Sequence, residues 1–149
     1  VFEKVEAGEA DAGLIIHEGQ LTYRDAGLKK VVDLGEWWFE ETGLPLPLGV
    51  NGVRKSFGRP LMECLTGLVQ ASIVYALDHR DEAVQYALQF ARGLTDKLAD
   101  EFVGMYVNDF TVDMGERGRR AIEELLERGH QAGVIPQRVD CEFVYPGQK

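Results

Sequence analysis

The residue best suited to chemistry is His17, which directly follows the apolar run Leu14, Ile15 and Ile16. A continuous apolar run is typical of a strand covered on both faces, as in a parallel sheet. Ligands of open α/β sheets bind beyond the carboxyl ends of the strands, which is where this histidine would lie. Imidazole titrates near neutral pH and can act there as a general base. The alternative is a structural histidine that caps the strand end by bonding a backbone carbonyl.

The same region gives little support to a metal site. His17 and Glu18 do not start a His-Glu-x-x-His zinc motif, because Leu21 stands where the second histidine belongs. Cys64 and Cys141 are far apart and form no Cys-x-x-Cys pair, so we expect two buried thiols in a reducing cytoplasm. The sequence therefore predicts no metal.

A second candidate surface is the segment with Leu44, Leu46 and Leu48, which alternate with two prolines. Alternate residues of an extended segment face the same way, so the three leucines present one apolar surface. This surface either lines a pocket or lies in the core of a connection between lobes. Trp37 and Trp38 are adjacent helical positions that face different ways, and we expect at least one of them to pack.

Charge and composition narrow the class of partner. A formal net charge of −9 over 149 residues argues against nucleic acid, whose phosphates repel an acidic surface. No apolar run approaches the roughly 20 residues of a membrane span, so we expect no membrane partner. His79 and His130 are expected to be structural, in a helix connection and near a helix end. Because the chain begins at Val1 rather than methionine, we expect further sequence upstream.

The elements that would position these residues change in character near Ser56. Before it, strands are predicted at 14–16, 31–34 and 49–54, with a short helix over 36–41 that Gly43 stops. After Pro60 the apolar spacing is helical, with a last strand at 141–145. Strands mixed with helices imply an α/β architecture, and the pieces do not close into a complete sheet. We therefore expect part of a larger two-lobed fold.

Three stretches carry a family resemblance: 8–18, 32–38 and 42–49, joined later in the chain by 106–108 and 113–115. Together they resemble the C-terminal half of the 1,4-dihydroxy-6-naphthoate synthases of the futalosine route to menaquinone. The resemblance implies a two-lobed fold like that of type II periplasmic solute-binding proteins. Residues 1–55 would be the end of the second lobe. Residues 56–149 would be the mainly helical return segment of the first.

The resemblance also implies an activity, that of a cytoplasmic lyase. The family converts the small molecule cyclic dehypoxanthinyl futalosine to 1,4-dihydroxy-6-naphthoate without metal or organic cofactor. His17 matches the family's proposed general base, and Ile16, Glu18, Leu46 and Leu48 are the implied substrate contacts. Because the match covers half of such an enzyme, we expect this chain to be inactive alone.

Two alternatives stay open. The chorismate dehydratases share the fold and pathway, but carry a Gly-Asp pair where this chain has His17 and Glu18, and a more aromatic segment near Leu46 and Leu48. A non-catalytic solute-binding or sensor module would need no base at the strand end. The histidine therefore favours the lyase over both.

Overall fold

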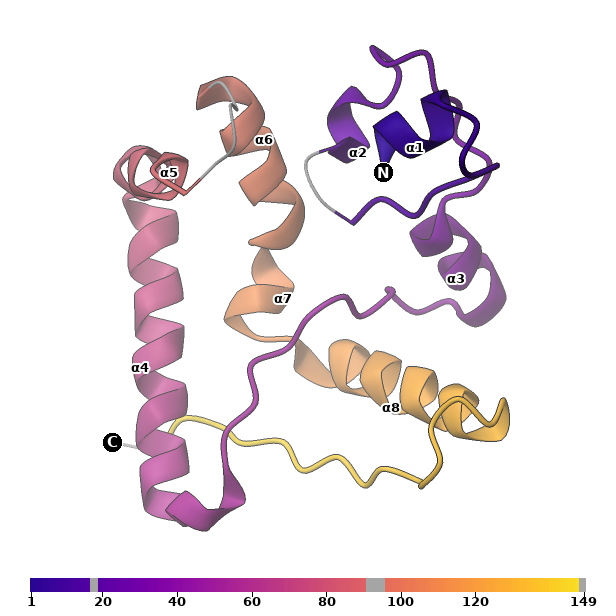
Figure 1. The fold of residues 1–149 in the computed structure, drawn as a ribbon. Coiled ribbons are helices and arrows are strands. Elements are labelled where there is room, and N and C mark those ends of the chain that lie inside the picture. The colour runs from indigo at the N-terminus through magenta and orange to yellow at the C-terminus, as the bar shows by residue number, and fades with distance from the viewer. Residues whose placement is uncertain (17–18, 91–95, 148–149) are drawn as a thin grey trace.

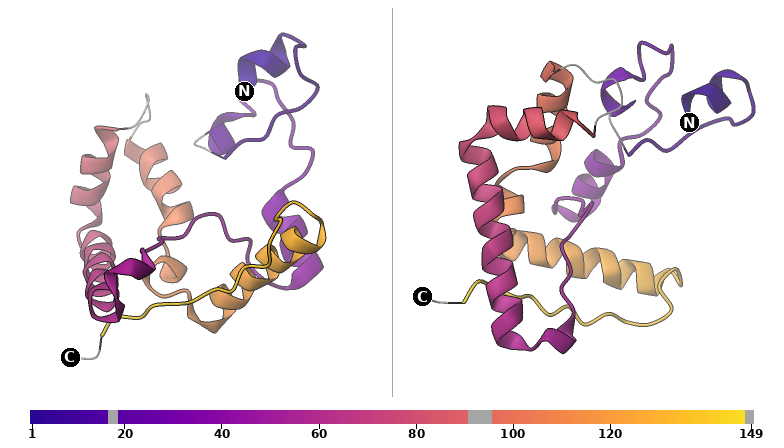
Figure 2. Two further views of the ribbon diagram at one scale, coloured as in Figure 1. Left: turned by 60° about the horizontal axis from the view of Figure 1, so that its bottom comes forward. Right: turned by 60° about the vertical axis from the view of Figure 1, so that its left-hand side comes forward.

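The computed structural model describes residues 1–16, 19–90 and 96–147, which form helices joined by turns and long extended segments (Figure 1). The elements in chain order are α1 (Phe2–Glu6), α2 (Gly19–Thr22), α3 (Leu34–Thr42), η1 (Lys55–Phe57), α4 (Arg59–Asp78), α5 (Arg80–Leu88), α6 (Asp96–Tyr106), α7 (Asp109–Val112) and α8 (Gly115–Gln131). The two long helices, α4 and α8, lie at a steep angle to one another (Figures 1 and 2).

The α/β expectation is wrong: the described residues contain no strand and no sheet. The apolar runs that predicted strands are extended but lie in solvent, with Leu14 64%, Ile16 71% and Val31 87% exposed. A β-strand exists only where a neighbouring strand accepts and donates its backbone hydrogen bonds. None of these runs has such a neighbour among the described segments, so the two-lobed α/β architecture is not what this chain forms. The division at residue 55 stays a prediction.

Helix α3 forms where the short helix was predicted. The Asp33 carboxylate caps it by accepting from the backbone N–H groups of Gly35 and Glu36, at 3.0 and 3.2 Å. Gly43 ends it in the left-handed conformation, with φ 68°, which favours glycine. Trp38 is buried and Trp37 is half exposed, which confirms that at least one tryptophan packs.

Helix α3 packs against α8 through this tryptophan. The Arg128 guanidinium lies 5.3 Å from the centroid of the Trp38 ring, and Arg117 lies 5.7 Å from the Phe39 ring. Ala121 of α8 is also buried, at 1% exposure. Trp38 and Ala121 are two of the four apolar side chains that are buried in the described structure.

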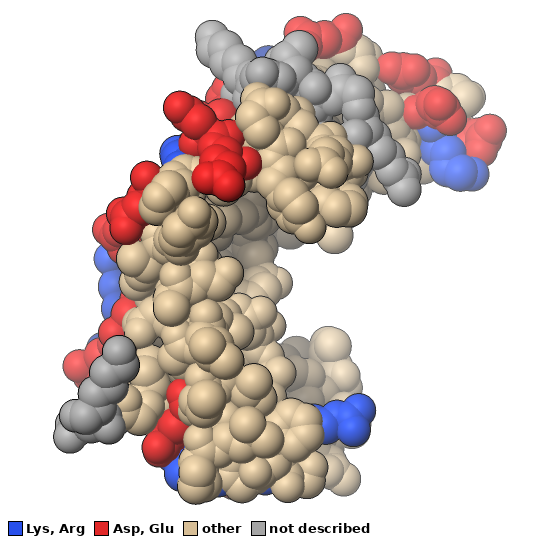
Figure 3. Space-filling view, turned by 90° about the vertical axis from the view of Figure 1, so that its left-hand side faces the viewer, with Lys and Arg blue, Asp and Glu red and all other residues tan. Residues whose placement is uncertain are grey.

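Helix α4 begins after Gly58 with Pro60 in its first turn, where a missing backbone N–H is not needed. By length and composition it is the one described helix that could cross a membrane. A single helix of this kind is weak evidence for a membrane protein, because core helices of soluble proteins pass the same test. Large apolar side chains remain exposed along it: Leu61, Leu68, Val69, Val74 and Tyr75. Figure 3 views the molecule from this side, where uncharged residues cover most of the surface and acidic residues gather near its upper part.

The C-terminal segment runs back along α8 to the start of α4 (Figure 2). Arg138 pairs with Glu127 of α8 at 2.9 Å, and Glu142 reaches Lys55 at 2.9 Å and Arg59 at 3.7 Å. The hydrogen bond and charge of Lys55 hold the pKa of Glu142 below its ordinary value.

The Glu142 contacts predict a pH-dependent contribution to stability. A carboxylate with a lowered pKa stabilises the folded chain above its unfolded pKa, and this contribution is lost as pH falls through the folded pKa. Urea unfolding of the native chain and of Glu142→Gln should therefore differ at pH 7 and converge at acidic pH. The pair is exposed, so added salt should shrink the difference at pH 7. A difference that grows on acidification would contradict the assignment.

The two cysteines differ in environment, and the expectation that both are buried is wrong for Cys64, which is exposed. Cys141 is partly buried, and burial, with smaller contributions from Glu123 and Asp140, raises the pKa of its thiol. Because the thiolate is the nucleophile, iodoacetamide should alkylate Cys64 faster than Cys141 at pH 8. Peptide mass spectrometry over time measures both rates in one sample, and Cys64→Ser should leave only the slow site. Equal rates in the folded chain would contradict this prediction.

Candidate functional site

His17 and Glu18 lie outside the described residues. The structure does describe the residues on either side of them. On one side Ile16 is 71% exposed at the end of an extended segment. On the other side Gly19 is buried and begins α2. In the sequence, the predicted base therefore comes between a residue with an exposed apolar side chain and a buried helix start.

Helix α2 is tied to α6 by a hydrogen bond between residues 86 positions apart. The Gln20 side-chain amide donates to the Tyr106 hydroxyl at 2.7 Å, in a partly buried position. Figure 1 shows α2 and the end of the preceding segment on the side of the N-terminal part that faces α6. This contact is the feature that sequence reasoning missed. The stretch 106–108 carries part of the family resemblance, but nothing in the sequence links Tyr106 to Gln20.

The Tyr106 end of this contact is itself held by a capped turn. The Thr111 hydroxyl donates to the Tyr106 carbonyl at 2.9 Å and accepts from the Asn108 backbone N–H at 3.1 Å. The Asn108 side chain accepts in turn from Phe110 N–H at 3.0 Å. Asn108 and Thr111 thus form a capping box at the start of α7. The polar stretch that begins at Asn108 therefore leads directly into a short helix.

A further contact connects this turn to α4. The Gln70 side-chain amide donates to the Val112 carbonyl at 3.1 Å, and α4 packs against α7. Farther along, Arg80 donates to the Asp100 carboxylate at 2.6 Å and to its carbonyl at 2.9 Å, which joins the start of α5 to α6. Side-chain hydrogen bonds therefore join α4 to α7 and the start of α5 to α6.

The leucine segment is only partly covered. Leu44 and Leu46 are half-buried and Leu48 is 68% exposed. Its first residue is held by Thr42, whose hydroxyl accepts from Leu44 N–H at 3.1 Å and donates to the Trp38 carbonyl at 2.7 Å. The Thr42 hydroxyl thus fixes the start of the segment at the end of α3, while Leu48 at the other end is exposed to solvent.

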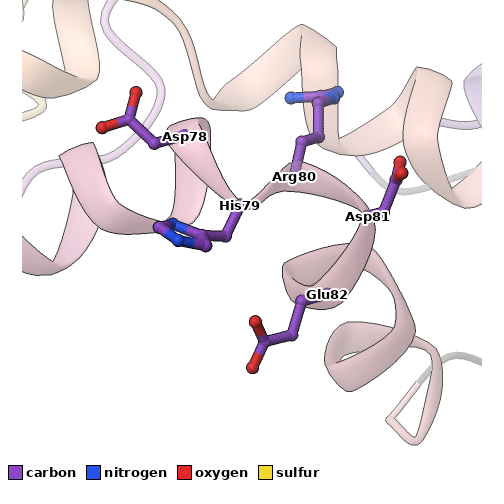
Figure 4. Close-up of a pocket in the computed structure, with 5 residues that line it drawn as sticks. All are labelled: Asp78, His79, Arg80, Asp81 and Glu82. Atoms are coloured by element: carbon purple, nitrogen blue, oxygen red, sulfur yellow. The ribbon is translucent and has the colours of Figure 1, made fainter.

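A surface depression at the junction of α4 and α5 is lined by Asp78, His79, Arg80, Asp81 and Glu82 (Figure 4). It does not bring these groups together for chemistry, because their side chains diverge and Arg80 is already bound to Asp100. The His79 ring stacks on Tyr75 with centroids 3.9 Å apart, and its Nδ1 lies 2.9 Å from the Tyr75 carbonyl. His130 Nδ1 lies 3.0 Å from the Ile135 carbonyl. Both histidines have the structural roles that the sequence predicts.

No group of three or more His, Cys, Asp or Glu residues in the described ranges is placed to hold a metal ion.

The arrangement of helices and extended segments defines a fold shared with a longer protein. It matches the crystal structure of a protein from Archaeoglobus fulgidus with a TM-score of 0.86 and 43% sequence identity. The match covers 91% of this chain and 51% of that protein. The fold of this chain therefore corresponds to about half of that longer protein.

The chain belongs to the menaquinone biosynthesis family, whose sequence profile matches residues 2–131. It is 41% identical over 146 residues to a 1,4-dihydroxy-6-naphthoate synthase from Streptomyces coelicolor, covering 98% of this chain and 52% of that one. It is 44% identical over 134 residues to a synthase of the same name from Thermus thermophilus, covering 90% and 49%. The chain spans about half the length of the curated relatives it matches.

Proposed function

We propose that this chain contributes the general base of a 1,4-dihydroxy-6-naphthoate synthase, a lyase of menaquinone biosynthesis. The observation that carries the proposal is the 41–44% identity to two such synthases over 90% or more of this chain. The substrate proposed is the small molecule cyclic dehypoxanthinyl futalosine, as the family resemblance implies. The two unpaired thiols, Cys64 and Cys141, suit the reducing cytoplasm as the site of the reaction.

His17 has the role of the base in this proposal. Its neutral imidazole takes a proton from the substrate, carbon–carbon cleavage expels the sugar-derived fragment, and aromatisation of the new ring drives the reaction forward. Ile16 and Leu48 support the proposal because they hold exposed apolar side chains that a naphthalene ring system can cover. Glu18 and Leu46 are the further substrate contacts of the proposal.

The experiment is a fusion in which this chain replaces the matching half of the Streptomyces coelicolor relative, to which it aligns over 146 residues. The purified fusion is given cyclic dehypoxanthinyl futalosine, and 1,4-dihydroxy-6-naphthoate is measured by chromatography. We expect catalytic turnover from the fusion and none from this chain alone.

The same assay separates the alternatives. Dehydration of chorismate by the fusion would indicate the sister activity, and tight binding without product would indicate a solute-binding module. A fusion that folds cooperatively and gives no product would contradict the proposal.

A further inference from the structure

We propose that one exposed face of α4 is the surface against which the other half of the family's polypeptide packs. The face, which we call the α4 stripe, consists of uncharged, exposed residues spaced alternately three and four apart: Leu61, Cys64, Leu68, Ala71 and Tyr75. Residues at this spacing lie along one side of a helix, and the same spacing forms the seam between packed helices. The inference depends on the family of the chain and not on the base proposed for the reaction.

The opposite face of α4 is used inside the chain. Met62 is buried at 4% exposure, and the Gln70 side chain donates to the Val112 carbonyl of α7 at 3.1 Å. At 3.6 residues per turn, Gln70 lies about 160° around the helix from Leu68. Contacts within the described chain therefore account for one face of α4 and leave the stripe exposed.

The stripe is a large apolar surface for a folded chain to leave in water. Leu61 is 46%, Leu68 62% and Tyr75 57% exposed. Residues 64–77 include no Asp, Glu, Lys or Arg, and uncharged residues cover most of this side of the molecule in Figure 3. Contiguous exposed apolar patches of this kind mark surfaces that bind another protein segment or a membrane.

The length of the relatives indicates what covers the stripe. This chain accounts for 52% and 49% of the two synthases and for 51% of the matched crystal structure. Each of these molecules therefore contains about as much polypeptide again. A segment linked in the same molecule has a high effective concentration at the stripe, roughly millimolar, so it outcompetes a second copy. A bilayer favours apolar side chains on every face, whereas α4 has Thr66 and Gln70 on its packed side.

Thiol alkylation tests the proposal, because Cys64 lies in the stripe. The probe is iodoacetamide, and the sample is the fusion with the matching Streptomyces coelicolor half. Peptide mass spectrometry gives the alkylation rate in the native fusion and in the same fusion unfolded in urea. We expect Cys64 to react at least about tenfold more slowly in the native fusion. Ser72→Cys, beside the stripe, should show similar protection. Arg120→Cys, at an exposed position of α8, is the control and should stay within about threefold of its unfolded rate.

A charge placed in the stripe gives a second, independent measurement. Leu68→Glu should lower the urea midpoint of the fusion, because docking would bury an unpaired carboxylate. The same substitution in this chain alone is the control and should leave the midpoint unchanged at low protein concentration, since Leu68 is exposed there. An unchanged midpoint in the fusion would overturn the proposal.

The alkylation assay also identifies the other possible occupants. Protection of Cys64 in the fusion that grows with protein concentration would indicate a second copy. Protection that requires added phosphatidylcholine–phosphatidylglycerol vesicles would indicate a membrane. Either result would overturn docking of the other half, as would equal protection at Cys64 and Arg120→Cys.

Failure of this inference and failure of the proposed function give different results. A fusion that protects Cys64 but forms no naphthoate would contradict the function and leave the docking surface intact. An active fusion in which Cys64 reacts at its unfolded rate would contradict the docking surface alone. If the fusion does not unfold cooperatively, cysteines at the aligned positions of the intact Streptomyces coelicolor relative decide the question, and their free alkylation would overturn the proposal.

Discussion

Replacing His17 with asparagine is expected to lower turnover of the fusion by about 100- to 10,000-fold, the range that a positioned general base contributes. Asparagine keeps a polar side chain of similar reach but cannot accept a proton at neutral pH. The loss should lie in kcat, because the proton transfer occurs in the transition state and not in substrate binding. Steady-state rates of naphthoate formation measure it directly.

The chain offers a matched control for this substitution. His79→Asn makes the same chemical change at an exposed histidine that stacks on Tyr75 at the α4–α5 junction. It should leave kcat and KM within about twofold of the parent fusion, since His79 is exposed and none of the residues proposed to contact the substrate belongs to that junction. Near-normal turnover in His17→Asn, with the far-UV circular dichroism unchanged, would remove His17 from the mechanism.

The largest expected effect on stability comes from Trp38→Ala. Trp38 is 3% exposed and packs between α3 and α8, where Arg128 lies over its ring. Removing a buried tryptophan deletes its apolar contacts and leaves a cavity, at a cost of about 3–5 kcal/mol in the free energy of unfolding. Urea unfolding followed by circular dichroism at low protein concentration measures the change.

The neighbouring Trp37 supplies the control, because it is the same residue type at 48% exposure. Trp37→Ala should cost about 1 kcal/mol or less. Trp38→Phe should cost less than Trp38→Ala, since it keeps an aromatic ring and removes a buried indole N–H that has no hydrogen-bond partner among the described residues. Equal losses for Trp37→Ala and Trp38→Ala would contradict the packing described for α3.

Local signals in the sequence predicted local structure well. The helix over 36–41 and its end at Gly43 are confirmed by α3, and the helical region after Pro60 by α4. Just before α8, the Asp113 carboxylate accepts from the N–H of Gly115, the first residue of that helix, at 2.8 Å. Caps, glycines and prolines act on backbone groups a few residues away, so the sequence contains the information directly.

The strand predictions were wrong because a strand depends on a partner elsewhere in the chain and not only on its own residues. The run Leu14 to Ile16 is apolar enough for a buried strand, but a strand also needs a hydrogen-bonding neighbour, which its own sequence does not encode. The same limit applies to α4. Its apolar spacing predicted a helix correctly, but the spacing does not say what covers Leu61 and Leu68, which are exposed in the structure.

By itself the sequence determined the family and the short helix that Gly43 ends, and it predicted the candidate base His17, because motifs and caps are contiguous in the chain. Only the tertiary structure decided which tryptophan is buried and which residue holds the start of α2. The Gln20–Tyr106 hydrogen bond joins residues 86 positions apart. No periodicity or spacing along one chain predicts such a contact, because it depends on how the helices between the two residues fold back on each other.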